Sequence, residues 1–205
     1  MPGTFEPLPG GGAAVALDDV EISIIRSLAA QLLELIGPGP AEDASADPLA
    51  ELFAEGPSEP PSDPVLRRLF PDAYTDPSEF PDTAEQAEEA RAYSSEFRRY
   101  TENDLRAGKR DNALAVIRSL DELTIESGGD GVGGGVLKLT PERSVLWLKA
   151  LNDIRLAIAA RLDITDEEDS EILYRLPDTD ERKPLVMAYL WIGGLQESLV
   201  ETLSD

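Results

Sequence analysis

The segment from 140 to 162, TPERSVLWLKALNDIRLAIAARL, constrains the fold of this chain more than any other. Thr140 can cap a helix, Pro141 fits the first helical position because no intrahelical N–H bond is needed there, and Glu142 suits the positive end of the helix dipole. Apolar residues then recur at helical spacing, with more on other sides of the helix: Leu146, Trp147, Leu148, Ala150, Leu151, Ile154, Leu156, Ala157 and Ile158. A helix that is apolar on most sides is typically buried, so this segment predicts the central helix of the fold.

Short strands are predicted near the N-terminus and just before the central helix. Segments 4–8 and 13–17 flank a Pro-Gly-Gly-Gly turn, which indicates a hairpin, and Pro7 confines the first strand to a sheet edge. A third strand is predicted at 136–139. Because the second and third strands each lead directly into a capped helix, we expect a small sheet from which both helices start side by side.

The rest of the apolar pattern is helical. Gly108 is expected to break or kink one long helical run into two parts. Besides the central helix, the sequence predicts helices over 18–36, 65–70, 82–107, 111–125 and 184–203. The predicted class is therefore mainly α, a helical bundle with a small accessory β-hairpin or three-stranded sheet.

A length of 205 residues with 41% hydrophobic content fits a single helical domain over 1–205. Between 38 and 64 the composition changes to seven prolines and seven carboxylates without Lys or Arg, which predicts a mobile acidic loop. Leu49, Leu52 and Phe53 are the exception, since their helical spacing fits either a transiently docked turn or a partner-binding motif.

Charge and composition exclude several functional classes. The net charge of -23 disfavours nucleic acids and anionic membrane surfaces as partners. The lack of Cys and His excludes disulfides, thiolate nucleophiles, His-dependent triads and metal sites that need these ligands. The N-terminus lacks a secretory pattern and no apolar run approaches membrane-spanning length, so we expect a cytoplasmic protein.

Two motifs imitate ligand sites without meeting their requirements. Gly129, Gly131 and Gly134 match the letters of a dinucleotide fingerprint, but a helix precedes them and a strand follows, which is the reverse of the required order. The acidic run 163–169 lacks the glycine and glutamate that a calcium loop needs, and acids at a helix start suit the helix dipole. We therefore predict no catalytic, cofactor-binding or metal-binding residues and no cofactor.

One helical segment is net basic, and it supplies the candidate protein-binding residues. Arg91 and Arg98 are seven residues apart and share a helix face, and the same spacing joins Arg99 and Arg106. The segment can be a solvated helix with local pairs such as Glu102 to Arg106. Alternatively, it can dock an acidic partner or the protein's own acidic loop.

Polar residues also interrupt the central helix. Asn152, Asp153 and Arg155 are predicted to form a buried polar network, because an unsatisfied buried polar group costs about 1 to 3 kcal/mol. The alternative is a ligand-facing cluster beside Trp147.

Three segments carry a family resemblance: the opening GGGAAVALDDVEISIIRSLAAQLLELIG, LFPDAY at 69–74, and WLKALNDIRLAIAARLDI at 147–164. They resemble an uncharacterised bacterial domain-of-unknown-function family, number twenty-seventeen. The resemblance implies a gene neighbourhood near the adaptor of the Clp protease, and members have been labelled transcriptional regulators. It implies no functional residue.

Together these features predict a non-enzymatic interaction or regulatory protein. The expected partner is a protein, and the gene neighbourhood that the resemblance implies points to a component of the Clp system. Arg99 and Arg106 are expected to steer an acidic surface of that partner toward the chain. Two alternatives stay open. A transcriptional regulator requires a helix-turn-helix, and a carboxylate-based hydrolase requires an enclosed pocket with two or more acids of perturbed pKa.

Overall fold

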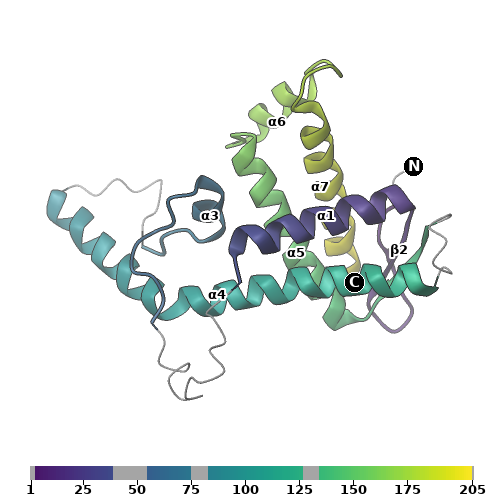
Figure 1. Ribbon diagram of the computed structural model, residues 1–205, viewed down its shortest axis with the longest axis horizontal. Helices are drawn as coiled ribbons and strands as arrows, with labels where there is room; N and C mark the ends of the chain where they lie inside the picture. Colours follow the sequence, from purple (N-terminus) through teal and green to yellow (C-terminus); the bar gives the residue numbers. More distant parts are fainter. Residues whose placement is uncertain (1–2, 39–54, 75–82, 127–133, 205) are drawn as a thin grey trace. The chain divides into compact units, whose positions relative to one another are not determined.

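The computed structural model describes residues 3–38, 55–74, 83–126 and 134–204, and most of them are helical (Figure 1). Three short strands form one sheet. The predicted class, a mainly helical fold with a small accessory sheet, is therefore confirmed.

Several predictions fall outside the described residues. They include the docked turn or binding motif at Leu49, Leu52 and Phe53, most of the acidic loop, and the greater part of the glycine-rich connector.

The chain groups into two compact units, Met1–Leu35 with Lys109–Asp205, and Ile36–Gly108. We call them the first and the second unit and describe each by itself. The single domain expected from the length stays a prediction.

The sheet of the first unit has the strand order β1-β2-β3, with both neighbouring pairs antiparallel. Its strands are β1 (Glu6–Pro7), β2 (Ala13–Leu17) and β3 (Gly135–Leu139). Between β1 and β2 the Leu8 amide donates to the Gly12 carbonyl at 3.1 Å, and the Gly11 amide donates to the Leu8 carbonyl at 3.0 Å. The predicted hairpin and the edge position of Pro7 are therefore confirmed.

A glycine lies at each end of the β2–β3 ladder, where backbone passes too close for a side chain. Gly12 has φ +87°, and a Cβ there would lie 2.2 Å from the Leu139 carbonyl oxygen. Gly134 has φ +65°, and a Cβ there would lie 2.2 Å from the Leu17 carbonyl oxygen. Both positions therefore require glycine for its conformation and for space.

The helices after β2 and β3 begin as their caps predict. Asp18 Oδ1 accepts from the Glu21 amide at 2.8 Å and Glu21 Oε2 accepts from the Asp18 amide at 2.9 Å, a capping box that starts α1 (Asp19–Ile36). Thr140 caps α5 (Pro141–Arg161) by accepting from the Arg143 amide at 3.3 Å. The expectation that the two helices start side by side is wrong, because antiparallel pairing places their starts at opposite ends of the ladder.

Helix α5 is central to the first unit, as predicted. Trp147 and Leu151 are both 0% exposed, and the Trp147 indole N–H donates to Ser119 Oγ at 3.3 Å. The most extensive packing of α5 is with α7 (Lys183–Ser204), which confirms the predicted last helix. The shorter α6 (Glu167–Tyr174) also packs against α7 (Figure 1).

Helix α4 (Ala84–Glu126) runs without interruption through Gly108, so the predicted break there is wrong. One glycine in a helix interior costs only about 1 kcal/mol. Buried residues lie on both sides of it along the helix, with Glu102 before and Ala113 and Val116 after. Packing on both sides of Gly108 therefore outweighs the small helix-breaking preference of the glycine.

The second unit contains residues 84–108 of α4, together with α3 (Pro64–Leu69). Asp63 caps α3, accepting from the Val65 and Leu66 amides at 2.8 and 3.1 Å. The predicted helix at 65–70 is therefore confirmed within one residue at each end.

Candidate protein-interaction surface

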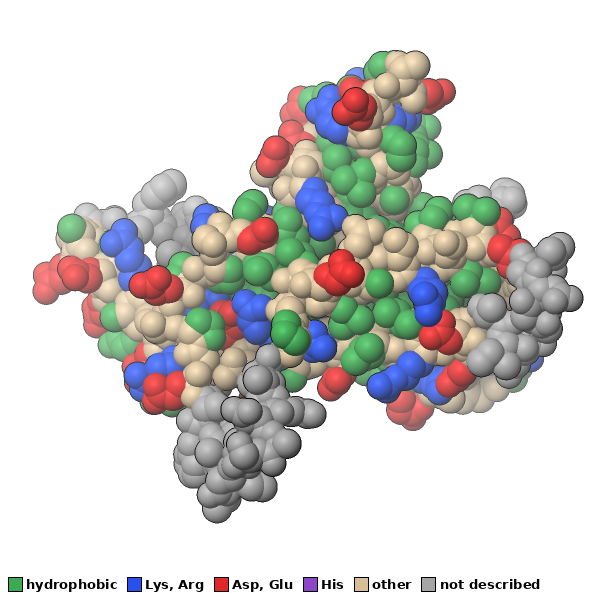
Figure 2. Space-filling view, viewed as in Figure 1, with side chains coloured by type: hydrophobic (Ala, Val, Ile, Leu, Met, Phe, Trp, Pro, Cys, Tyr) green, Lys and Arg blue, Asp and Glu red, His purple; other side chains and the backbone are tan. Residues whose placement is uncertain are grey.

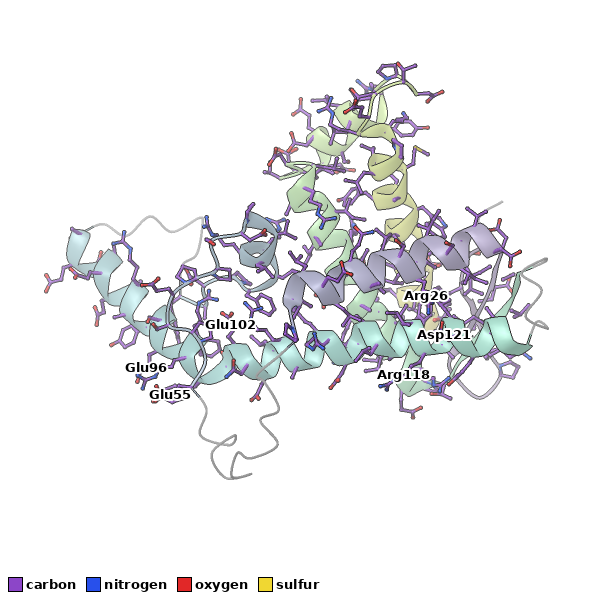
Figure 3. The ribbon with its side chains drawn as sticks, viewed as in Figure 1. Arg26, Glu55, Glu96, Glu102, Arg118 and Asp121 are labelled. Carbon is purple, nitrogen blue, oxygen red and sulfur yellow. The ribbon has the colours of Figure 1, made fainter. Side chains whose placement is uncertain are left out.

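A buried carboxylate, Glu102, belongs to the second unit and has an exposed fraction of 1%. Arg98 Nη1 donates to Glu102 Oε2, and Arg106 Nε donates to Glu102 Oε1 at 2.9 Å. Figure 3 labels Glu102 where its side chain leaves α4. Because both carboxylate oxygens accept from guanidinium groups, the buried negative charge is compensated twice.

The same two arginines hold the 69–74 segment, LFPDAY, against α4. Arg98 Nη2 donates to the Phe70 carbonyl at 3.0 Å and to Asp72 Oδ1 at 2.8 Å. The Arg106 guanidinium lies 4.5 Å from the centre of the Phe70 ring, and its Nη1 donates to the Ile36 carbonyl at 2.9 Å. The segment is therefore fixed by charge-assisted bonds as well as by the buried side chains of Leu69 and Phe70.

Tyr74, at the end of this segment, lies beside two aromatic residues of α4. Its amide donates to Ser94 Oγ at 3.2 Å. Its ring centre lies 6.0 Å from that of Tyr93 and 6.0 Å from that of Phe97, with an interplanar angle of 89° to Phe97. The exposed fractions of Tyr74, Tyr93 and Phe97 are 55%, 53% and 44%, and we call these three residues the aromatic patch.

Tyr93 of the aromatic patch has a carboxylate partner on the same helix. The Tyr93 hydroxyl donates to Glu89 Oε1 at 3.2 Å. This hydrogen bond raises the pKa of Tyr93, and the negative charges of Glu89 and Glu96 raise it further. Glu96 is labelled in Figure 3. The Tyr93 hydroxyl therefore lies within hydrogen-bonding distance of a carboxylate.

Arg99, on the same helix, has an aromatic partner of its own. Its Nη2 donates to the Tyr100 hydroxyl at 2.6 Å, and its guanidinium carbon lies 4.9 Å from the centre of the Tyr100 ring. Glu55 lies 3.5 Å from Arg99 Nε. The hydrogen bond with Tyr100, followed by the charge of Glu55, raises the pKa of Arg99.

The four arginines predicted as candidate protein-binding residues are not all exposed. Arg98 is 4% exposed, so the expectation of an exposed basic residue is wrong there. The predicted Glu102–Arg106 pair is present, but its carboxylate is buried instead of solvated. Among the four, Arg91 is exposed and makes no ion pair with any other described residue. A role of Arg91 or Arg99 in binding stays a prediction.

The basic segment was expected either to be a solvated helix or to dock an acidic partner or the protein's own acidic loop. In the structure its arginines contact acidic residues of the chain itself. Glu55 comes from the predicted acidic loop and pairs with Arg99. Asp72, which follows α3, pairs with Arg98. These arginines are already partly neutralised within the chain.

The aromatic patch was missed because Tyr93 and Phe97 fit the apolar stripe of a helix. The buried face of this part of α4 instead contains Ser94, Arg98 and Glu102. Polar residues at i, i+4 and i+8 are usually interpreted as a solvated face. The sequence does contain a signal for the ion network. Positions 98, 102 and 106 alternate in charge at i, i+4 spacing, so their side chains can pair along one helix face.

In the first unit, the predicted network of Asn152, Asp153 and Arg155 is not formed. Asp153 is 3% exposed and lies 2.5 Å from Lys109 Nζ. Arg155 is exposed and lies over the Tyr189 ring, so its predicted burial is wrong. Successive helical residues point about 100° apart, which directs these side chains to different neighbours.

Burial dominates the electrostatics of Asp153. It raises the pKa of the carboxyl group, while the hydrogen bond and charge of Lys109 act in the opposite direction. Asn152, which is half-buried, accepts from Gln196 Nε2 at 3.4 Å on α7. The alternative of a ligand-facing cluster beside Trp147 gains no support, because Trp147 is fully buried.

The acidic run after α5 serves a helix start, as its structural interpretation predicted. Asp166 caps α6 by accepting from the Asp169 amide at 3.0 Å. Asp169 accepts from the Thr165 amide at 2.8 Å, and that hydrogen bond lowers its pKa. Within the described ranges, no group of three or more potential metal ligands comes together.

These features define the class: a mainly helical protein whose second unit displays aromatic side chains above a buried ion network. The chain belongs to the domain-of-unknown-function family DUF2017, whose model matches residues 3–203. The family assignment made from the resemblance is thereby confirmed. No curated protein and no solved structure matches the chain. None of the helices in the described ranges is both long enough and apolar enough to cross a membrane.

Proposed function

We propose that this chain is a non-enzymatic interaction or regulatory protein of the cytoplasm and that it binds a partner protein through the aromatic patch. The observation that supports the proposal is the exposure of Tyr74, Tyr93 and Phe97 in mutual contact. Single exposed apolar residues are normal on protein surfaces, whereas contiguous ones are typical of interaction sites.

The elements that carry the aromatic patch are ordered, which also favours this proposal. Tyr74 is attached to a segment that Arg98 and Arg106 hold in place, and Tyr93 and Phe97 are on a helix. A surface that is already ordered loses less conformational entropy on binding. Tyrosine is also enriched among the residues that contribute most to binding free energy.

The proposed partner is a component of the Clp proteolytic system. This choice rests on the gene neighbourhood that the family resemblance implies. The steering role expected for Arg106 loses its basis, because that residue bonds to Glu102 and to the Ile36 carbonyl.

Association kinetics with the purified Clp adaptor test the proposal. The Tyr93→Ala, Phe97→Ala double variant should lose at least about tenfold in affinity, mainly through faster dissociation. Tyr174→Ala is the matched control, since Tyr174 is 55% exposed on α6 in the first unit. Its affinity should equal that of the wild type.

The outcomes separate the partner from the surface. Absence of wild-type binding means that the adaptor is the wrong partner. Equal losses in the double variant and in Tyr174→Ala, or no loss in either, mean that the aromatic patch is not the binding surface.

Neither alternative function gains a specific observation. For a DNA-binding regulator, Arg98, Arg99 and Arg106 are paired with carboxylates and are not free for phosphates. For a carboxylate-based hydrolase, Asp153 has a raised pKa but bonds to Lys109, and no second acid among the described residues bonds to it.

A further inference from the structure

The charge around the aromatic patch gives the chemistry of its partner. Glu89, Tyr93, Glu96 and Tyr100 follow one another at helical spacing on α4, so carboxylates and rings alternate along one stripe. Glu89 and Glu96 are exposed. On the face that Figure 2 presents, apolar side chains of the second unit lie among charged ones. A surface of this kind offers a cation both an aromatic face and a carboxylate.

The protein itself contains examples of such pairing. The guanidinium of Arg99 lies over the Tyr100 ring, with Glu55 beside it. The guanidinium of Arg106 lies over the Phe70 ring and bonds to Glu102. Each cation therefore contacts a ring and a carboxylate together, and the face of an aromatic ring attracts a cation electrostatically. Within the described part of the chain, no such cation is found over the Tyr93 ring.

We propose that the aromatic patch binds a basic segment of the partner protein, with an arginine or lysine side chain over Tyr93 and its charge between Glu89 and Glu96. This inference rests on the proposed function, because it specifies the partner of the same surface. It also reverses the charge expected from the sequence, where an acidic partner was matched to exposed arginines.

Other occupants fit the charges less well. An acidic segment would bring carboxylates against Glu89 and Glu96, and like charges in contact disfavour association. A second copy of this chain would do the same, since its net charge is -23. A basic segment gains from both the rings and the carboxylates.

Selection from a phage-displayed library of random peptides tests the proposal with the full chain as bait. Peptides are selected on the wild type and depleted on the Tyr93→Ser, Phe97→Ser variant, after circular dichroism has shown that the variant is folded. The recovered peptides should contain Arg and Lys above their frequency in the starting library. Recovery of neutral or acidic peptides overturns the basic partner but leaves the surface in place. Failure to recover any peptide that discriminates the variant overturns both.

A conservative change separates charge from shape. The Glu89→Gln, Glu96→Gln variant keeps the side-chain size, and the amide oxygen introduced at position 89 can still accept from the Tyr93 hydroxyl. Binding of a selected peptide should weaken by about threefold or more, and its dependence on salt should decrease. The control is Glu197→Gln, Glu201→Gln, which removes two carboxylates from α7. Equal affinities of the two double variants would overturn the proposal.

Self-association is measured on the same proteins by analytical ultracentrifugation. A monomeric wild type agrees with the proposal. A dimer that the Tyr93→Ser, Phe97→Ser variant abolishes would identify a second copy as the occupant and would overturn it.

Discussion

Removal of the Glu102 carboxylate is the perturbation that tests the scaffold of the aromatic patch. In the Glu102→Ala variant, Arg98 and Arg106 lose the group that accepts from both of them. Arg98 cannot turn to solvent without moving the segment above it, because it is 4% exposed. The variant therefore leaves a buried positive charge with fewer partners.

The loss in the free energy of unfolding depends on the partners that Arg98 and Arg106 keep in the Glu102→Ala variant. Breaking a buried ion pair by removing one partner costs about 3 to 5 kcal/mol. Arg98 keeps the Phe70 carbonyl and the partly exposed Asp72, while Arg106 keeps the Ile36 carbonyl. We therefore expect a loss near the lower end of the range, about 3 kcal/mol. The Glu102→Ala, Arg98→Ala double variant should cost about 1 to 3 kcal/mol less than the sum of its single variants.

Urea unfolding followed by far-ultraviolet circular dichroism measures these free energies. The control is Glu122→Ala on the same helix, where Glu122 and Arg143 form an exposed pair at 2.8 Å. That substitution should cost less than about 1 kcal/mol. If Glu102→Ala costs no more than Glu122→Ala, the buried network does not stabilise the second unit and the reasoning fails.

Three further predictions concern single positions. Gly108→Ala should stabilise the chain by about 0.5 to 1 kcal/mol in urea unfolding, because a Cβ there meets nothing within 4 Å, and a destabilised variant would show that the helix needs glycine. Asp153→Asn tests a pH dependence: because burial raises the folded-state pKa, the contribution of Asp153 to stability falls as pH rises from its unfolded pKa of about 3.9 through its folded pKa. The stability of the wild type relative to this variant should therefore fall as pH rises from about 4 toward neutrality, and a constant difference would contradict the assignment. Leu151→Ala should cost about 2 to 5 kcal/mol, since Leu151 is fully buried, and a loss below about 1 kcal/mol would show that α5 is peripheral.

Local sequence signals predicted most of the fold. The capping residues Asp18 and Thr140 and the glycines before β2 act over a few residues, so they identify helix starts and the hairpin directly. The relative direction of β2 and β3 depends on how distant segments pair, and the side-by-side start of α1 and α5 was therefore wrong. The predicted break at Gly108 was wrong for a related reason, because packing along α4 outweighs a small local preference.

The candidate site was harder to predict, because its buried side chains are charged. Arg98 and Glu102 resemble surface residues in the sequence, and only their neighbours in the fold show that each neutralises the other. Tyr93 and Phe97 resemble core residues but are exposed. A pattern that places apolar residues in the interior and charged residues at the surface is therefore wrong for both pairs.

Hydroxyl-radical footprinting with mass spectrometry tests the central claim, that the aromatic side chains face solvent while the arginine network is buried. Each comparison uses residues of one type, so intrinsic reactivity cancels. Tyr93 should be oxidised about as fast as Tyr174, and Phe97 much faster than Phe70, whose exposed fraction is 1%. Oxidation of Phe97 as slow as that of Phe70, together with oxidation of Tyr93 much slower than that of Tyr174, would contradict the account, because the aromatic patch would then be covered within the chain.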